Sequence, residues 1–502
     1  MPDRLVHPGA AQPPVDWANV TGPLTTPQSG RSVSIFSPAY RISTLGIIIL
    51  MTIIAFEAMA VATALPTAAS DLDGLGSYGW SFTGFLVASV VGMVTSGMYS
   101  DSRGPRVPLL IGLLLFTVGL LLGSGAGVMQ VLVAARVVQG LAVGLLITAM
   151  YVVMGEAYPD VIRPKIFAAL SSAWIVPGLV GPVIAGWVTE HLSWRWVFGG
   201  LAPFVVVGGL LMLPSLRQLR SHSASDPQRV RARSSRIGYA VLTASGIAGI
   251  ANIGESQRPW SIAGAVIGVG MLVIGLRVLL PAGTTTFAAG VPAAVAFRGV
   301  LAGIFFGMEV IVPLTLKVQH HYSPTLAGLP LMLSAVTWAL GSQVQSRSRT
   351  LSRRFLVGCG LALMAVAGGG MALTASAAMP GWTAFVAWPI AGLGAGFGLT
   401  TTSVAMLEFT NDADRGSDSA SLQLADSTAS ALCTAFSGAL LASAAHGALS
   451  YGSGLSTVFL GMSALALLAI TRASRLRPAG GGVGRVVPAR STSGVGQVKP
   501  AP

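Results

Sequence analysis

Apolar segments of about 20 residues recur from one end of the chain to the other, and no other feature constrains its fold as strongly. A helix of that length spans the roughly 30 Å of hydrocarbon in a bilayer. Fourteen such segments alternate with short polar loops, which predicts an all-α polytopic membrane protein. They lie near residues 44–66, 79–99, 107–127, 129–154, 166–188, 196–216, 236–254, 259–280, 293–316, 325–346, 354–376, 381–406, 419–445 and 455–472.

Composition excludes a soluble protein. Charged residues make up 9% of the chain and hydrophobic residues 53%, whereas a soluble domain carries about 25% charged residues. The net charge of +13 does not indicate a nucleic-acid partner, because the basic residues lie in loops and tails between the apolar segments. Only three lysines accompany 27 arginines, a bias that suggests a high-GC bacterial genome.

The distribution of positive charge predicts the orientation in the membrane. With a cytoplasmic N-terminus, inner loops and tails hold 26 of the 30 lysines and arginines. The outer loops hold only Arg195, Arg258 and Lys317. Because cytoplasmic loops carry such an excess, we expect fourteen spans in a bacterial plasma (inner) membrane, with both termini cytoplasmic. A twelve-span alternative would require segments 236–254 and 259–280 to form a re-entrant or surface hairpin.

The chain lacks the sequence patterns of common enzymes. It has no phosphate-binding loop, no H-E-x-x-H or G-x-S-x-G sequence, and no histidine within a span. We therefore expect no catalytic residue, no metal site, no cofactor and no ATP hydrolysis. Cys359 and Cys433 lie far apart in apolar segments and are interpreted as small packing residues.

Three carboxylates and one arginine lie inside predicted spans, where a charge is costly and marks a functional site. They are Glu57, Arg136, Glu309 and Asp426. At 1.5 Å per residue, Glu57 lies about 13 Å and Arg136 about 10 Å below the outer surface, so the two can meet at one level. Glu309 lies about 10 Å deep by the same count. We expect Glu57 and Glu309 to face a central cavity and bind protons or cations, and Asp426 either to join them or to serve helix packing.

Aromatic and sulfur side chains accompany these acids in the sequence. Phe56 and Met59 flank Glu57, and Phe305 and Met308 precede Glu309. Trp174 lies in the fifth span. Such groups stack on flat, lipophilic cations, so they form a candidate substrate cavity; ordinary packing is the alternative.

The loop after the second span reads Gly97-Met-Tyr-Ser-Asp101-Ser-Arg103-Gly104-Pro105-Arg106. A small residue permits close helix approach, and an acid followed by basic residues makes a charged turn at the membrane surface. A degenerate copy follows the tenth span and keeps Gly341 and several arginines but lacks the acid. Two copies at corresponding positions indicate a parallel internal repeat.

Taken in order, these segments resemble the major facilitator superfamily. The loop at 97–106 is similar to its G-x-x-x-D-x-x-G-R-R/K signature, and Arg136-Val-Val-Gln139-Gly140 to its R-x-x-Q-G proton-transfer pattern. Residues 177–186, PGLVGPVIAG, resemble the antiporter motif G-x-x-x-G-P-x-x-G-G. Residues 56–66, FEAMAVATALP, resemble L-D-x-T-x-V-N-V-A-L-P of the fourteen-span drug–proton antiporters, with Glu57 in place of aspartate.

The resemblance implies the major facilitator fold, with two six-helix bundles and two extra central helices. The bundles would occupy 43–216 and 293–474, and the extra helices 236–280. A basic cytoplasmic loop would occupy 217–235, and disordered cytoplasmic tails 1–42 and 475–502. Two sets of residues would carry the family's motifs: Gly97, Asp101, Gly104 and Arg106 as a conformational latch, and Gly178, Gly181, Pro182 and Gly186 as the antiporter motif.

The function implied is proton-coupled export of lipophilic or cationic drugs or metabolites by alternating access. The expected partners are a small-molecule substrate, protons and membrane lipid, and we expect a monomer. One alternative is a facilitator-type importer of a small nutrient, against which the segment at 177–186 argues. Another is a non-transporting sensor or lipid-handling membrane protein, which would keep its function after removal of the intramembrane acids.

The orientation can be tested with introduced cysteines. A cysteine near Ser221 should be protected from a membrane-impermeant maleimide in intact cells, because the basic loop is expected in the cytoplasm. A cysteine near Ser256 should react. The opposite pattern would contradict the orientation, and protection at both positions would favour twelve spans.

Overall fold

The computed structural model describes residues 34–478 except 39, 160, 219–226, 253–258, 349, 412–414 and 448. Every regular element in this part of the chain is a helix. Most of the expected N-terminal tail (1–33), the centre of the expected basic loop (219–226) and most of the expected C-terminal tail (479–502) lie outside the described residues. We call the side on which α1 begins the near side, and the side on which it ends the far side.

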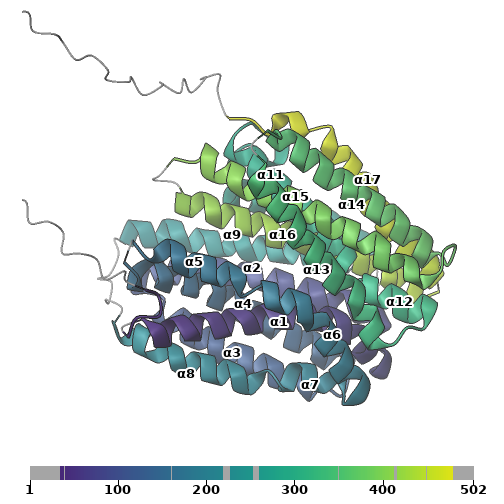
Figure 1. The fold of residues 1–502 in the computed structure, drawn as a ribbon, viewed down its shortest axis with the longest axis horizontal. Helices are drawn as coiled ribbons and strands as arrows, with labels where there is room; N and C mark the ends of the chain where they lie inside the picture. The colour runs from purple at the N-terminus through teal and green to yellow at the C-terminus, as the bar shows by residue number, and fades with distance from the viewer. Residues whose placement is uncertain are drawn as a thin grey trace, which may run out of the picture.

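Two helical bundles make up most of the molecule (Figure 1). The N-terminal bundle contains α1 (Arg41–Asp71), α2 (Tyr78–Arg103), α3 (Arg106–Ser124), α4 (Met129–Ala157), α5 (Arg163–Ser172), α6 (Ile175–His191), α7 (Trp194–Gly199) and α8 (Ala202–Gln218). The C-terminal bundle contains α11 (Val291–Glu309), α12 (Val312–His320), α13 (Pro324–Arg347), α14 (Arg353–Ala375), α15 (Ala384–Phe409), α16 (Arg415–Ala445) and α17 (Tyr451–Ile470). Between them in sequence lie α9 (Pro227–Ala251) and α10 (Pro259–Leu279).

Prolines follow directly after the helix breaks within three of the predicted spans. A proline lacks the backbone N–H and is best tolerated in the first turn of a helix, although Pro66, Pro182, Pro330 and Pro389 lie inside helices of this chain. Pro177, Pro203 and Pro313 each lie in the first turn after a break, in α6, α8 and α12 respectively. The fifth predicted span is thereby divided into the short helix α5 and the 17-residue α6.

The two bundles repeat one packing scheme. In the N-terminal bundle α2 packs against α4, and in the C-terminal bundle α13 packs against α15. Glycine permits the close approach in both: a Cβ added at Gly92 would lie 2.3 Å from the Leu141 carbonyl oxygen, and one at Gly341 would lie 2.7 Å from that of Leu393. This correspondence supports the internal repeat inferred from the two similar loops.

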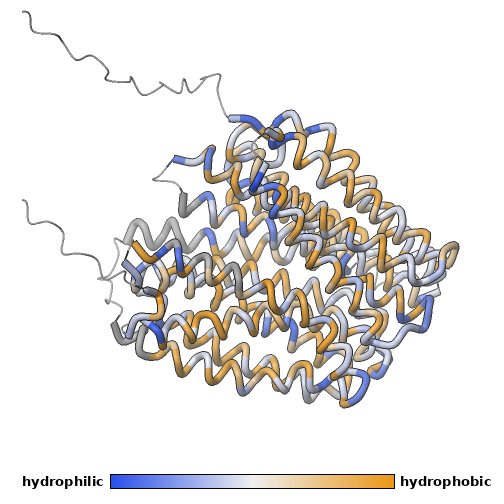
Figure 2. The backbone as a smooth tube through the Cα atoms, in the orientation of Figure 1, coloured by the Kyte–Doolittle hydropathy of each residue, from blue (hydrophilic) through white to orange (hydrophobic). Residues whose placement is uncertain are grey.

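Among the described residues, twelve helical segments are long and apolar enough to cross a membrane, so the fourteen spans expected from the sequence are not confirmed. The two that fall short are the fifth and seventh predicted spans. The fifth is divided before Pro177, and the apolar part of α9, Arg236–Ala251, is a shorter helix. Hydrophobic residues dominate the middle of the helices and hydrophilic residues gather towards their ends (Figure 2), as a membrane environment requires.

The bundles meet closely on the far side. Tyr78 donates a hydrogen bond of 2.5 Å to the carbonyl oxygen of Val310, and the Lys317 ammonium lies 3.0 Å from the Thr67 hydroxyl. The Thr325 hydroxyl donates to the Glu190 carboxylate at 2.6 Å. Towards the near side the helices of the two bundles diverge (Figure 1). This V-shaped arrangement places the contact between the bundles at one membrane surface.

The α2–α4 contact should not tolerate a methyl group. A Cβ at Gly144 would lie 2.2 Å from the Ser89 carbonyl oxygen, so Gly144→Ala forces two helix backbones apart, at a cost of about 1–3 kcal/mol. Gly358→Ala is the control because no atom lies within 4 Å of its added Cβ. We expect a lower midpoint of thermal unfolding in detergent for Gly144→Ala and an unchanged or higher one for Gly358→Ala. Equal midpoints would contradict the tight contact.

Candidate functional site

A buried arginine joins three helices of the N-terminal bundle. The Arg136 guanidinium from α4 forms an ion pair with the Glu57 carboxylate from α1. It also donates to the Ser81 carbonyl oxygen of α2 at 3.2 Å and to the Gln139 side-chain oxygen at 2.7 Å. Its charged carbon lies 4.2 Å from the centre of the Phe85 ring. Glu57 and Arg136 are 0% and 2% exposed, so the predicted meeting at one depth is confirmed.

Two polar atoms of the Glu57–Arg136 site make no hydrogen bond to the described residues. Within the described part of the chain, the second carboxylate oxygen of Glu57, Oε2, and the Gln139 side-chain nitrogen are buried without a hydrogen-bond partner. A buried polar group without a partner costs about 1–3 kcal/mol. The site therefore retains an acceptor and a donor that a proton, a substrate group or a rearranged side chain can satisfy.

Phe56 and Met59, close to Glu57 in the sequence, face α6. A Cβ added at Gly181 would lie 3.5 Å from the Met59 Cβ and 3.7 Å from the Phe56 ring. Trp174 lies at the start of α6 and is partly exposed. Glu57 itself has no exposed surface, so in this conformation it does not face an open cavity as the sequence analysis expected. Its carboxylate pairs with Arg136, which itself packs against Phe85 and Gln139.

A second arginine–carboxylate pair lies in the C-terminal bundle. Arg298 of α11 donates from Nε and Nη2 to one oxygen of Asp426 in α16, at 3.0 and 2.6 Å. Its Nη1 donates at 3.1 Å to the Leu399 carbonyl oxygen and to the Ser403 hydroxyl of α15. The side chains of Arg298 and Asp426 are 20% and 10% exposed. This pair joins three helices, as Arg136 does in the other bundle.

Glu309 has a different environment. It is buried at the end of α11, and within the described part of the chain its carboxylate has no ion-pair or hydrogen-bond partner. Phe305 and Phe306, one turn earlier on the same helix face, both contact the Trp338 ring, and Phe305 also stacks on Trp388 at 5.2 Å. An unpaired acid therefore lies next to a cluster of four aromatic rings.

Two candidate cavity residues are enclosed within the C-terminal bundle. Phe305 is almost fully buried between Trp338 and Trp388. Met308 is fully buried, with its sulfur 3.1 Å from the position that a Cβ at Gly368 of α14 would occupy. The partly exposed Phe306 and Trp338 are the aromatic residues of this cluster that are open to an approaching molecule.

The latch residues lie at the near end of α2. Gly104 has a φ of +85° and ends the helix, a conformation that favours glycine. Asp101 and Arg106 are exposed on either side of this turn. A Cβ at Gly97 would make only an ordinary contact, 3.8 Å from Thr148. The expected close approach at this position is not found, because the tight α2–α4 contact lies deeper, at Gly92.

Three of the four antiporter-motif residues, Gly178, Pro182 and Gly186, lie on the seam between the bundles, whereas Gly181 faces α1. A Cβ at Gly186 would lie 2.6 Å from the Cα of Thr325 in α13. The carbonyl oxygen of Pro182 would lie 2.7 Å from a Cβ at Gly328 of α13. Gly178 faces Ala335, also in α13. The motif therefore forms the α6 side of a helix contact between the two bundles.

Sequence reasoning missed Arg298, which it counted among the cytoplasmic loop charges. The available signal was its position: it lies eight residues into α11, beyond the start of the predicted span at 293. The aromatic partners Phe306, Trp338 and Trp388 were also missed, because residues on three helices meet there. Among the described residues, no group of three histidines, cysteines or carboxylates is arranged to hold a metal ion.

Comparisons with known proteins point to one family. Residues 47–432 match the sequence profile of the Major Facilitator Superfamily. Multidrug transporter protein MdtP of Bacillus subtilis is 30% identical over 153 residues, which are 30% of this chain and 28% of that protein. A protein of Mycobacterium tuberculosis named "Probable multidrug-efflux transporter" is 28% identical over 303 residues, 58% of this chain and 62% of the relative. The chain thus spans less than two thirds of these relatives.

Solved structures share the fold. A POT family transporter in complex with 5-aminolevulinic acid aligns with a TM-score of 0.64 at 13% identity, over 87% of this chain and 96% of that one. A D-xylose-proton symporter aligns with a TM-score of 0.55 at 17% identity, over 87% and 97% of the two chains. At such low identity the likeness concerns the fold alone.

Arg298 and Asp426 should stabilise the protein as a pair, so that loss of one charge costs more stability than loss of both. Asp426→Asn leaves the partly buried guanidinium without its counter-charge. Breaking a buried ion pair in this way lowers the free energy of unfolding by about 3–5 kcal/mol. The double variant Arg298→Met/Asp426→Leu removes both charges and should recover most of that loss. Thermal unfolding in detergent measures both. If the double variant is less stable than Asp426→Asn, the two residues do not act as a pair.

Proposed function

Because the chain belongs to the major facilitator superfamily, we propose that it is a proton-coupled exporter of lipophilic, cationic compounds that works by alternating access. Membership of the family makes it a membrane transporter and not an enzyme. The names of the two relatives, which concern multidrug transport and efflux, support export. The proton coupling, the substrate class and the direction rest on the site.

The observation that carries the proposal is the buried Glu57–Arg136 pair. Protonation of Glu57 would remove the negative charge that Arg136 neutralises, and would leave the guanidinium free to turn to another acceptor. Because Arg136 joins α1, α2 and α4, such a change acts on the packing of the whole bundle. A carboxylate that gains and loses a proton at this position would thereby couple proton movement to helix movement.

The proposed substrate site lies around Glu309. An unpaired carboxylate attracts a cation, and the faces of Phe306 and Trp338 add a cation–π attraction of about 0.5–2 kcal/mol. Flat apolar surfaces beside one negative charge suit a lipophilic cation better than a polyhydroxylated nutrient. Proton binding at Glu309 would neutralise the site and release such a substrate. This competition between proton and cation provides antiport.

The proposed topology has fourteen spans and cytoplasmic termini in a bacterial plasma membrane. The seventh span would be α9, whose polar first part extends beyond the membrane, and the fifth would be α5 together with α6. α6 supports this count because it packs along α1 and α13, both of which are long enough to span. The near side would then be cytoplasmic, and the structure would correspond to an inward-facing state. Asp101 and Arg106 would act in the opposite state, when the near ends meet.

Glu57→Gln tests the coupling. The amide cannot gain and lose a proton, so we expect loss of export driven by a proton gradient, with normal insertion because the span becomes more apolar. Glu57→Asp should keep part of the activity. Dye export by everted vesicles, measured with the proton gradient present and then collapsed, gives the readout.

Glu408→Gln is the matched control, since it removes a half-exposed carboxylate that pairs with Arg353 at the near ends of α14 and α15. A surface pair of this kind contributes about 0–1 kcal/mol, and export should persist. If Glu57→Gln still concentrates dye when a gradient is imposed, coupling belongs to Glu309 or Asp426. Retained export after all three acids are neutralised would contradict proton coupling by these residues.

A further inference from the structure

The two seams between the bundles are covered differently. One seam is formed by α2 and α16 and the other by α6 and α13. α9 packs on both α2 and α16, and α10 packs on α9. The helix that packs on both α6 and α13 is α1, which belongs to the N-terminal bundle itself. An additional helix therefore bridges the first seam and not the second.

α9 fills the α2/α16 seam where the bundles diverge. On the near side Val90 of α2 and Leu424 of α16 are buried in one cluster with Ala240 of α9 and Leu279 of α10. Ala240 has no exposed surface. The bundles thus contact each other here through α9, which acts as a wedge between them.

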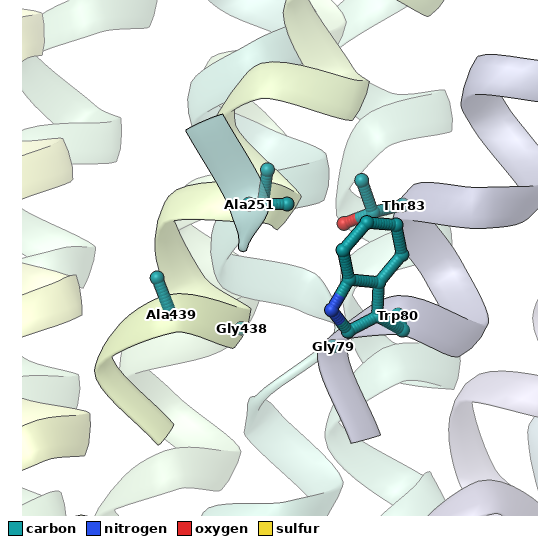
Figure 3. Close-up of a pocket in the computed structure, with 7 residues that line it drawn as sticks. Gly79, Trp80, Thr83, Ala251, Gly438 and Ala439 are labelled. Atoms are coloured by element: carbon teal, nitrogen blue, oxygen red, sulfur yellow. The ribbon is translucent and has the colours of Figure 1, made fainter. Parts of the chain in front are cut away.

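The far end of the same seam is closed by direct contact and by a tryptophan. A Cβ at Gly79 of α2 would lie 2.2 Å from the Cα of Gly438 in α16. Trp80 packs with Ile247 and Ala251 of α9. Figure 3 shows its indole ring in the crevice between α2, α16 and the end of α9. These two features narrow the far end of the seam, and α9 covers its near part.

The α6/α13 seam loosens towards the near side. An added Cβ would lie 2.6 Å from α13 at Gly186, on the far side, but 3.4 Å from it at Gly178, nearer the middle. One turn beyond Gly178 on the same face of α6, Trp174 is 37% exposed, and one turn beyond Ala335 on α13, Ala339 is exposed. The exposed apolar surface beside this seam faces the near leaflet of the bilayer.

Close glycine contacts hold the hairpin together as a unit. A Cβ at Gly246 of α9 would lie 2.6 Å from the Gly268 carbonyl oxygen of α10, and one at Gly268 would lie 2.6 Å from that of Gly246. A Cβ at Gly275 would lie 2.1 Å from the Thr243 hydroxyl. Contacts of this kind allow two membrane helices to pack at short distance. The wedge is therefore a helix pair and not a single mobile helix.

We propose that the α9–α10 hairpin is a lateral seal that closes the α2/α16 seam to the bilayer and leaves the α6/α13 seam as the entrance for substrates dissolved in the near leaflet. This inference rests on the proposed export function. Lipophilic cations accumulate at the membrane surface because their apolar part leaves water. A transporter that is open to the leaflet on one side would take them from there, and the seal would prevent lipid from entering at the opposite side.

Carbene labelling from within the membrane tests the seal without transport. A photoactivatable diazirine dissolved in the vesicle lipid reacts with side chains that lipid can reach, and mass spectrometry locates the products. We expect labelling at Leu340 of α13 and protection at Leu424 of α16. Ala240→Phe, which pushes α9 outward, and Trp80→Ala, which empties the far crevice, should each raise labelling of α2 and α16 severalfold.

Trp196→Ala is the control, because it removes an exposed tryptophan from α7, a helix that packs on α1, α3 and α6. Labelling of α2 and α16 should stay unchanged. Equal labelling of Leu424 and Leu340 in the unmodified protein would overturn the seal. So would unchanged labelling of α2 and α16 in both Ala240→Phe and Trp80→Ala.

Transport tests the entrance. Ala335→Phe fills the α6/α13 seam opposite Gly178 and should lower export of a membrane-dissolved cationic dye severalfold, while export of a water-soluble cation of equal charge is retained. Val336→Phe places the same aromatic side chain at an exposed neighbour and should leave both rates unchanged. If Ala335→Phe lowers export of both compounds equally, or of neither, the proposal that substrates enter through the α6/α13 seam is overturned. If the unmodified protein exports neither compound, the proposed function fails, and the labelling pattern still decides the seal.

Discussion

A guanidinium buried in hydrocarbon is the constraint on which the N-terminal bundle depends. Its charge must be neutralised and its N–H groups must find acceptors, because water is absent. Arg136 meets this requirement with the Glu57 carboxylate, the Gln139 side chain, the Ser81 carbonyl oxygen and the Phe85 ring. These partners come from α1, α2 and α4, so one side chain fixes the relative position of three helices. Any event that changes the charge of Glu57 acts on this arrangement.

The C-terminal bundle solves the same problem with different residues. Arg298 joins α11, α15 and α16 through Asp426, Leu399 and Ser403, whereas Glu309 lies apart from both pairs. The three acids of the spans thus have two distinct environments: Glu57 and Asp426 are ion-paired, and Glu309 is unpaired beside aromatic rings. Paired acids suit control of helix packing, and an unpaired acid suits a site that a cation enters and leaves.

The sequence predicted correctly those properties that depend on one helix alone, such as its position in the chain and the depth of a residue along it. Apolar length identified the helices, and a rise of 1.5 Å per residue placed Glu57 and Arg136 at one level. It failed where the outcome depends on several helices. Arg298 lies inside a predicted span and was still counted with the loop charges; its acceptors lie on two other helices, more than 100 positions away in sequence, so its pairing could not be predicted from α11 alone. The expected exposure of Glu57 to a cavity was wrong for this conformation, because the carboxylate is fully buried against Arg136 of α4.

By itself the sequence determined the class of the protein, the order of its helices and the family, since apolar length and the short motifs are local properties of the chain. Only the tertiary structure decided which acids are paired, which aromatic rings meet one helical turn from Glu309, and how the seams between the bundles are covered. The positions of α9 beside α2 and α16, and of Gly186 against Thr325, follow from the packing of distant helices. Side chains that meet across a bundle leave no periodic signal along the chain, because the helix that carries each of them remains apolar whichever neighbour it contacts.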